Sequence, residues 1–473
     1  MSALEALFDR IVQRVNINLR EFGFDVRPYV DSLVPFAKLS EFYGFYGISS
    51  QHPLDFSFNH SNLAGSYFLG KCRVTNSILY KSDIRGDELK KKGDVFTWKQ
   101  FSIPLTRDEG IRIEDSFLIK TLVHNYSHDP EHPEQFPICN TISARYSNIH
   151  GSPMDGSFLG PFATVDLTTM NDCIVGAFSY IQAGEVNHLY VEPGTVWVRS
   201  PDEFNFFYRF PEKPLSHYIH FDAGRPPEGL FMDFARSGKK EFSRVFASMH
   251  GKVVADVPGT SSVDQFSVVR GTTSIGENVL VAQRAYLDDA FLGKGANVQE
   301  NCFVINSQLI GFDVLAHGAK LYNVDLAEEV FVGFNAFVHG REQARISIGQ
   351  GCIVMPHTII DSATSLRVPA RSLVWGLITA PEDLEDHCLS LDTLVRVSDV
   401  YSSGRMEFRG SGKIFVDGFK QRIHHILEEN GAFFDGTSGR GHAQKNRHIS
   451  YNTIQPYGEG ELQGIFPTIA ILP

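Results

Sequence analysis

Three polar side chains in the second half of the chain share one spacing. Gln299, His317 and His339 each lie six residues after a glycine that follows an aliphatic residue. If the segments that carry them stack in parallel, these side chains would lie about 4.8 Å apart and form a polar ladder. Two imidazoles at that spacing repel each other when both are charged, so we expect lowered pKa values. A neutral imidazole is what a general base or a metal site requires.

The segments that would position these side chains are marked by a repeat. The glycines at 276, 293, 311, 333 and 349 recur on average every 18 residues or so, roughly three units of six. This period predicts turns of a three-sided coil of short parallel strands, which bury their aliphatic edges by stacking into one continuous column. The aliphatic–glycine pairs begin at Leu69, Leu159, Val175, Ile275, Leu292, Ile310, Val332 and Ile348.

Units such as LGPFATV from Leu159 and LAHGAKL from Leu315 resemble the hexapeptide-repeat superfamily. The resemblance implies a mainly β fold, a left-handed parallel β-helix solenoid with long insertions and helical N- and C-terminal additions, assembled as a homotrimer. It does not select one activity, because acyltransferases, γ-class carbonic anhydrases and non-catalytic scaffolds share the repeat. It covers residues 61–84, 111–123, 138–182 and 253–378.

The acyltransferase reading assigns roles by resemblance. In that group a histidine on the coil wall deprotonates an acceptor, which then attacks an acyl-thioester. His317 or His339 would be this base, with Gln299 beside them, and LAHGAKL favours His317. Arg341 and Arg345, in the loop HGREQAR, would bind a phosphate of coenzyme A. The alternative is that these histidines and arginines are solvated surface groups.

The γ-class carbonic anhydrase reading uses the same segment differently. LAHGAKLYN is similar to that family's metal-binding segment, with His317 at the first metal-binding histidine and Tyr322 in place of the second. That substitution removes a ligand from a three-histidine zinc site, so no metal ligand is assigned and metal content stays open.

A second group of histidines stands at four-residue spacing, which would align ligands on a helix. Its members are His124, His128 and His132, but Pro130 and Pro133 interrupt the segment. We therefore expect a solvated loop there, with metal binding as the less favoured alternative.

The chain divides into five predicted parts. Apolar residues at helical spacing predict an N-terminal helical cap over the open end of the coil, and the aromatic-rich insertion is expected to pack on the coil wall or a neighbouring subunit. The parts are residues 1–60 (cap), 61–185 (β-helix, first part, with insertions at 85–110 and 124–137), 186–252 (aromatic-rich insertion), 253–380 (β-helix, second part) and 381–473 (C-terminal helices and polar tail).

Composition narrows the classes of function. The chain has 473 residues and a formal net charge of −12, which argues against nucleic acid as a partner. Neither a secretory signal nor an apolar stretch long enough to span a membrane is recognisable, so we expect a cytoplasmic protein without a membrane partner. The six cysteines show no paired spacing and are expected to be reduced thiols.

These observations lead to one hypothesis and two alternatives. The hypothesis is an acyltransferase that moves an acyl group from acyl-CoA to a small acceptor at clefts between the subunits of a homotrimer. The first alternative is a non-catalytic trimeric scaffold that recruits a protein partner through residues 186–252 or the C-terminal region. The second is a γ-carbonic-anhydrase-like hydratase with a degenerate metal site.

Overall fold

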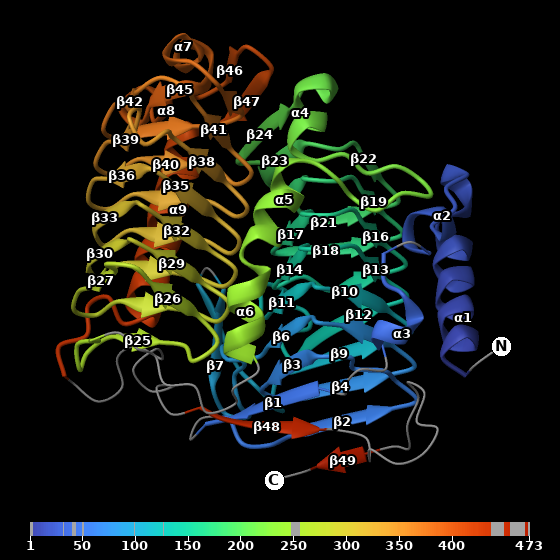
Figure 1. The fold of residues 1–473 in the computed structure, drawn as a ribbon. Helices are drawn as coiled ribbons and strands as arrows, with labels where there is room; N and C mark the ends of the chain where they lie inside the picture. The colour runs from blue at the N-terminus through green and yellow to red at the C-terminus, as the bar shows by residue number, and fades with distance from the viewer. Residues whose placement is uncertain are drawn as a thin grey trace. The chain divides into compact units, whose positions relative to one another are not determined.

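The computed structural model is mainly β and contains two parallel β-helices (Figure 1). We call them coil 1 and coil 2. Coil 1 belongs to a compact unit of Met1–Val198, Pro211–Leu230 and Ile449–Pro473, and coil 2 belongs to a second unit of Arg199–Phe210 and Phe231–His448. The structure describes residues 3–31, 33–39, 44–49, 52–98, 100–125, 127–246, 256–436, 449–454 and 469–471. Most of the polar tail therefore lies outside the described residues.

Coil 1 has three walls of parallel strands. Wall 1a contains β1 (Gly44–Ile48), β3 (Ser66–Leu69), β6 (Asp83–Arg85), β11 (Leu122–His124), β14 (Asn148–His150), β17 (Thr164–Asp166), β20 (Tyr180–Gln182) and β23 (Thr195–Ser200). Wall 1b contains β2 (Phe56–Asn59), β4 (Cys72–Thr75), β9 (Gly110–Glu114), β12 (Gln135–Cys139), β15 (Met154–Asp155), β18 (Thr168–Asn171) and β21 (Gly184–Asn187). Wall 1c contains β5 (Ile78–Tyr80), β10 (Phe117–Ile119), β13 (Ile142–Ser143), β16 (Phe158–Leu159), β19 (Ile174–Val175) and β22 (Tyr190–Val191).

Coil 2 repeats this plan with its own strands. Wall 2a contains β25 (Ser262–Val263), β28 (Leu280–Val281), β31 (Asn297–Val298), β34 (Val314–Leu315), β37 (Phe331–Val332), β40 (Ile353–Val354) and β43 (Ser372–Val374), with β45 (Cys388–Ser390) antiparallel at its end. Wall 2b contains β26 (Val268–Arg270), β29 (Tyr286–Asp288), β32 (Phe303–Ile305), β35 (Lys320–Tyr322), β38 (Phe337–His339), β41 (Ile359–Asp361) and β44 (Leu377–Ile378). Wall 2c contains β27 (Ser274–Ile275), β30 (Phe291–Lys294), β33 (Gln308–Gly311), β36 (Val324–Leu326), β39 (Ile346–Ile348) and β42 (Leu366–Val368).

The remaining elements are short helices, hairpins and terminal strands. The helices are α1 (Ala3–Asn18), η1 (Arg20–Phe22), α2 (Arg27–Val30), α3 (Phe36–Leu39), α4 (Glu212–Tyr218), α5 (Leu230–Ser237), α6 (Lys239–Phe246), η2 (Pro381–Asp383), α7 (Leu384–His387), α8 (Leu391–Leu394) and α9 (Gly412–Glu429). The other strands are β7 (Val95–Trp98), β8 (Phe101–Pro104), β24 (Phe204–Arg209), β46 (Val400–Ser403), β47 (Met406–Gly410), β48 (Ser450–Ile454) and β49 (Ile469–Ile471).

The expectation of one continuous column is wrong. Strands β25 to β44 hydrogen-bond only to one another and to β45 among the described residues. Each coil also encloses its own apolar core, with Val165 and Ile181 in coil 1 and Leu315 and Leu321 in coil 2. The repeat itself is confirmed, because each turn buries its aliphatic residues by stacking on the next.

Helix α1 follows its predicted apolar stripe but covers a different surface from the one expected. Leu7, Ile11 and Val15 are buried in a cluster that includes Ile142 and Ile174 of wall 1c. The helix thus lies on the side of coil 1, where a whole apolar wall is available to it, instead of over the open end. At that end, β48 and β49 pair antiparallel with β1 and β2 and satisfy their exposed backbone edges.

The aromatic-rich insertion packs on a coil wall. Strands β21 to β23 still belong to coil 1, and the apolar side chains of α5 and α6 contact wall 2b. The ring centroids of Phe234 and Phe303 lie 5.1 Å apart, and those of Phe231 and Phe337 lie 5.3 Å apart. On wall 2a, α9 places Phe419 against Phe331. None of the helices among the described residues combines the length and the apolar character that a membrane span requires.

Candidate functional site

His339 ends strand β38 on wall 2b, where the register of the turns places a polar group beside it. Tyr322 is its partner on one neighbouring strand and Asp361 on the other. The imidazole packs edge-on against the Tyr322 ring at 5.2 Å between centroids, and the His339 side chain is 24% exposed. The residue is therefore fixed in position and remains reachable from solvent.

A carboxylate and a guanidinium meet the same nitrogen of this ring. Nδ1 of His339 lies 3.0 Å from Asp361 Oδ1 and 2.9 Å from Arg341 Nη1, and Arg341 Nη2 donates to Asp361 Oδ1 at 2.9 Å. Burial raises the pKa of Asp361, but hydrogen bonds from His339 and Arg341 outweigh it and hold the pKa below its usual range. In the tautomer with the proton on Nδ1, that proton is donated to the ionised Asp361 and the Nε2 lone pair is left to accept a proton; in the other tautomer Nδ1 accepts from Arg341.

His317 lies in the turn between β34 and β35 and is also paired with a carboxylate. Its Nδ1 is 2.8 Å from Glu300 Oε2, and the His317 and Glu300 side chains are 2% and 5% exposed. The imidazole also packs on Phe334, with 5.2 Å between ring centroids. His317 and Glu300 form the imidazole–carboxylate pair that a general base requires. Both side chains are buried away from solvent, whereas His339 is partly exposed.

The predicted ladder of Gln299, His317 and His339 is wrong. Val298 pairs with Leu315, which sets buried Gln299 beside Ala316 and not beside His317. Gly293 and Gly311 both lie on wall 2c, in β30 and β33, but Gly311 pairs with Lys294, so the glycine alignment is displaced by one residue between Gln299 and His317. Gly333 instead follows β37 of wall 2a, so counting from it places His339 at a different part of the turn.

The two predicted phosphate-binding arginines already contact carboxylates. Arg345 forms a two-pronged pair with Asp325, with Nε to Oδ2 at 2.8 Å and Nη2 to Oδ1 at 2.6 Å. This hydrogen bonding raises the pKa of Arg345, and its donors are directed at the protein. Arg341 lies beside His339 with 41% of its side chain exposed. The structure therefore brings Arg341, but not Arg345, to the His339 dyad.

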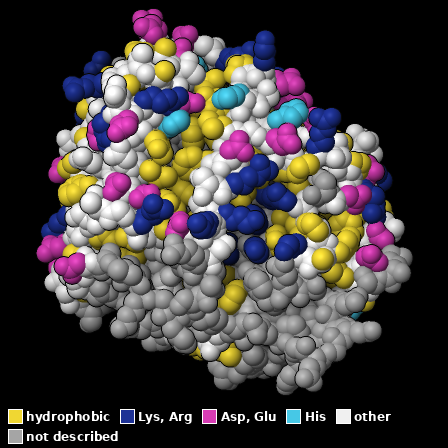
Figure 2. Space-filling view, viewed as in Figure 1, with side chains coloured by type: hydrophobic (Ala, Val, Ile, Leu, Met, Phe, Trp, Pro, Cys, Tyr) yellow, Lys and Arg dark blue, Asp and Glu magenta, His cyan; other side chains and the backbone are white. Residues whose placement is uncertain are grey.

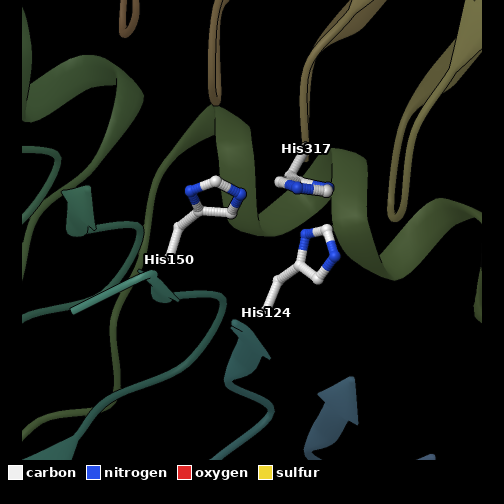
Figure 3. A group of neighbouring side chains, drawn as sticks. All are labelled: His124, His150 and His317. Atoms are coloured by element: carbon white, nitrogen blue, oxygen red, sulfur yellow. The ribbon is translucent and has the colours of Figure 1, made fainter. Parts of the chain in front are cut away.

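A polar column on wall 1a was not recognised from the sequence. The last residues of successive strands are in register there, and they are Arg85, His124, His150, Asp166 and Gln182. The rings of His124 and His150 lie side by side, 5.1 Å between centroids (Figure 3). The predicted grouping of His124 with His128 and His132 missed the pairing of His124 with His150. The available signal was that His150, Asp166 and Gln182 close three-residue strands at a 16-residue spacing, whereas His124 lies 26 residues before His150, across a loop.

Comparisons with known proteins agree with this architecture. A family model described as "hexapeptide repeat including loop" matches residues 101–223. A crystal structure described as a "putative acetyltransferase" from Desulfovibrio desulfuricans G20 is 50% identical, with a TM-score of 0.94 over 100% of this chain and 99% of that one. This chain belongs to the hexapeptide-repeat superfamily.

Other solved hexapeptide-repeat structures match less of the chain. A "putative acetyltransferase" from Bacillus cereus is 12% identical, with a TM-score of 0.27 over 38% of this chain and 90% of its own. A GDP-perosamine N-acetyl transferase variant from Caulobacter crescentus, in complex with CoA and GDP-perosamine, is 20% identical, with a TM-score of 0.10 over 25% and 53%. No curated protein matched the chain.

Membership of the superfamily confirms the predicted fold class. The protein is mainly β, a left-handed parallel β-helix solenoid with insertions and helical additions near both ends. The hexapeptide-repeat fold places imidazole–carboxylate pairs on the walls of both coils: His339 with Asp361 in coil 2, and His150 with Asp166 in coil 1.

Proposed function

We propose that this hexapeptide-repeat protein is an acyltransferase that moves an acyl group from a coenzyme A thioester to a hydroxyl or amine of a small acceptor, with His339 as the general base. The His339–Asp361 dyad is the observation that carries the proposal. It combines an imidazole held by its neighbours, an ionised carboxylate partner and solvent access on a coil wall. The acetyltransferase description of the Desulfovibrio relative, which is similar over the whole chain, supports the reaction class.

The proposed reaction needs one proton acceptor. Nε2 of His339 takes the proton of the acceptor group while its oxygen or nitrogen forms a bond to the thioester carbonyl carbon. Asp361, at Nδ1, stabilises the imidazolium that results. The carbon–sulfur bond then breaks, and the imidazolium returns the proton to the departing thiolate. The products are the acylated acceptor and coenzyme A, and His339 is again neutral.

Coenzyme A is a polyanion, and basic side chains near the dyad support its binding. Helix α5 packs on Phe337, two residues before His339, and the exposed side of α5 and α6 carries Arg236, Lys239 and Lys240. Figure 2 shows dark-blue Lys and Arg side chains in the region of these helices. We propose that these groups and Arg341 bind the phosphates of the thioester, whereas Arg345 stays with Asp325.

Several expectations from the sequence stay predictions. They are assembly as a homotrimer with sites at clefts between subunits, a cytoplasmic location, and a protein partner bound through residues 186–252 or the C-terminal region. Light scattering of the purified chain tests the homotrimer. His317, the histidine that the sequence favoured, serves as a comparison residue in the experiment below.

The test replaces the base and keeps its shape. His339→Gln is expected to lower kcat with acetyl-CoA by roughly 10²- to 10⁴-fold, the usual contribution of a general base. Thermal stabilisation by acetyl-CoA should stay unchanged, because the thioester is bound by other groups. A library of small amines and alcohols, with thiol release as the readout, identifies the acceptor first. The matched control is His317→Gln, which removes a buried imidazole of the same coil.

Two outcomes would contradict the proposal. Unchanged turnover in His339→Gln, with lost turnover in His317→Gln, would move the base to His317. Absence of both thiol release and acetyl-CoA stabilisation in the native protein would favour the non-catalytic scaffold.

A further inference from the structure

The outer face of wall 1b contains a groove that takes no part in the proposed acyl transfer. On three successive turns the same outward position holds a short side chain, Pro137, Pro153 and Thr169, each next to a core residue along the chain. Arg112 occupies this position on the preceding turn and Glu185 on the following one. The short residues leave a hollow between longer side chains, and its volume is about 250 Å³.

A loop before β12 forms one side of the groove. Asp129 Oδ1 accepts the backbone N–H groups of Glu131 at 2.8 Å and of His132 at 3.2 Å, which fixes the loop in a turn. His132 and Gln135 then lie along the groove. Because its volume is just below the range of about 300–1,000 Å³ for most ligand pockets, the groove suits a molecule the size of an amino acid.

Two opposite charges lie on either side of Cys139 in this groove. Arg112 Nη2 is 4.0 Å from Cys139 Sγ, and Asp155 is the register partner of Cys139 on the next strand. Among the described residues, the carboxylate nearest to the guanidinium is that of Glu114, 3.7 Å from Nε. Asp155 instead accepts from Asn140 Nδ2 at 2.7 Å. A cation and an anion are thus held near each other without forming an ion pair.

The thiol between the two charges is protonated. Burial raises the pKa of Cys139 to about 11, and the guanidinium of Arg112 offsets this only in part. A neutral thiol is a weak acceptor, so the donors of Arg112 remain available to an anion. A protonated thiol is also a poor nucleophile, and we therefore expect reversible binding in the groove.

The arrangement is complementary to a zwitterion. A guanidinium pairs with a carboxylate through two parallel hydrogen bonds, and the Asp155 carboxylate can accept from an ammonium group. An α-amino acid carries both of these groups on one carbon atom. An apolar side chain on that carbon would lie on the rings of Pro137 and Pro153, where it is shielded from water.

We propose that the wall 1b groove binds a free α-amino acid with an apolar side chain. Arg112 would bind its carboxylate and Asp155 its ammonium group, with Pro137 and Pro153 under its side chain. The site lies in coil 1, and the proposal does not depend on acyl transfer at His339. Because Arg112 and Asp155 belong to different turns, the bound ligand links strands β9 and β15 and should raise the melting temperature.

The test measures the binding of L-leucine, L-methionine and L-phenylalanine to the full chain by calorimetry and by thermal shift. We expect saturable binding of one equivalent. Arg112→Gln and Asp155→Asn should each weaken it about 10- to 100-fold, the usual effect of removing a charged hydrogen-bonding partner. Both side chains are exposed, so the unliganded variants should melt as the native protein does.

Analogues of the ligand separate the two charges. L-leucinamide lacks the carboxylate and N-acetyl-L-leucine lacks the ammonium group, so each should bind more weakly than L-leucine. Arg112→Gln should not weaken L-leucinamide further, and Asp155→Asn should not weaken N-acetyl-L-leucine further, because the missing partner leaves nothing to lose. Analogues that bind as tightly as L-leucine would contradict the proposal.

Two matched variants control for the surface charge of the wall. Arg73→Gln removes the register partner of Arg112 on the preceding turn, which pairs with Asp55. Glu185→Gln removes a carboxylate from the same outward position on a later turn. Both variants should bind L-leucine as the native chain does.

Cys139 provides a readout within the groove. Cys139 and Cys388 are the two partly exposed free thiols, and Cys388 lies on wall 2a. Saturating L-leucine should slow the alkylation of Cys139 by iodoacetamide, measured by peptide mass spectrometry, and leave that of Cys388 unchanged. Native protein that binds none of the three amino acids, or Arg112→Gln and Asp155→Asn variants that bind them as tightly as the controls do, would overturn the proposal.

Discussion

Coil 1 and coil 2 share a fold but use different turn lengths and different corner chemistry. Paired residues recur every 16 positions in coil 1, as at Ile149, Val165 and Ile181, and every 17 positions in coil 2, as at Val298 and Leu315. Hydroxyl groups fill one interior corner of coil 1, where each accepts a hydrogen bond from the backbone of the next turn. Its members include Ser61, Ser77 and Ser116.

One interior corner of coil 2 is filled with small apolar side chains, whereas at another corner Thr273 and Ser307 accept from the next turn as the serines of coil 1 do. Ala285, Cys302, Ala319 and Ala336 recur one turn apart, and each is fully buried. The fold therefore requires small residues at its corners but not a particular polarity. Whether a corner residue is polar depends on whether its hydroxyl can accept a hydrogen bond from the backbone of the adjacent turn. The three predictions that follow test this difference, from the largest expected effect to the smallest.

Gly293 in coil 2 should tolerate no side chain, whereas Gly110 in coil 1 should. A Cβ at Gly293 would lie 1.8 Å from the carbonyl oxygen of Ile310, a backbone atom that cannot move without shifting the next turn. We expect Gly293→Ala to cost about 3 kcal/mol or more in free energy of unfolding. Urea denaturation measures this cost.

The matched variant is Gly110→Ala in β9, where the new Cβ would meet the flexible side chain of Lys71 at 3.4 Å and its carbonyl oxygen at an ordinary contact distance of 3.7 Å. It should leave stability unchanged or raise it by up to about 1 kcal/mol. Equal losses in the two variants would show that the close approach of turns does not distinguish these positions.

Asp313 is a buried carboxylate in a column of coil 2 that also contains Ala296 and Val330. Burial raises its pKa from 3.8 to about 8, although the backbone N–H groups of Val330 and Gly311 donate to it. The folded state then holds the proton more tightly than the unfolded state. Stability from this group is complete below pH 3.8 and is lost as the pH rises through about 8.

The measurement is the difference in free energy of unfolding between the native protein and Asp313→Asn, from pH 4 to pH 9. The native protein should lose stability relative to the variant, by on the order of a few kcal/mol, as pH rises. Asp289 is the control, because the backbone N–H of Thr272 lowers its pKa. Asp289→Asn should give a flat difference over this range, and a flat difference for Asp313→Asn would contradict the prediction.

Ser116 tests the hydroxyl corner of coil 1. Its hydroxyl donates to the carbonyl of Glu114 at 2.7 Å and accepts from the N–H of Thr141 at 3.1 Å. Ser116→Ala leaves that buried N–H without its acceptor and should cost about 1–2 kcal/mol. Thermal and urea unfolding measure the loss.

The reverse exchange in coil 2 is Ala319→Ser. It should also destabilise, by about 1 kcal/mol, because the added hydroxyl enters a corner packed with apolar groups. Stabilisation by Ala319→Ser would show that the two corners are chemically interchangeable.

The candidate site was only partly predictable from the sequence. His339 was selected from its spacing after a repeat glycine and Arg341 as a phosphate-binding arginine of the loop HGREQAR, and the structure brings the two together. Asp361, which lies 3.0 Å from Nδ1 of His339, was missed because it lies one turn later, beyond the loop that contains Arg341 and Arg345. The pairing of His124 with His150 was missed for the same reason, since neighbours across turns are distant in the chain.

The sequence by itself determined the class of backbone. Aliphatic residues at regular intervals, with glycine or a small residue at each bend, can be buried together only by stacking turns, so the coil followed from local pattern. The same pattern occurs in both halves of the chain, and it carries no information about how many columns form. That was decided by tertiary structure, where β25 to β44 found hydrogen-bond partners among themselves.

Tertiary structure also decided which polar groups meet. A turn of 16 or 17 residues, lengthened in places by a loop, sets the register, and a displacement of one residue moves a side chain to another face. For that reason Gln299, His317 and His339 are not stacked, while His339 meets Asp361 and His124 meets His150.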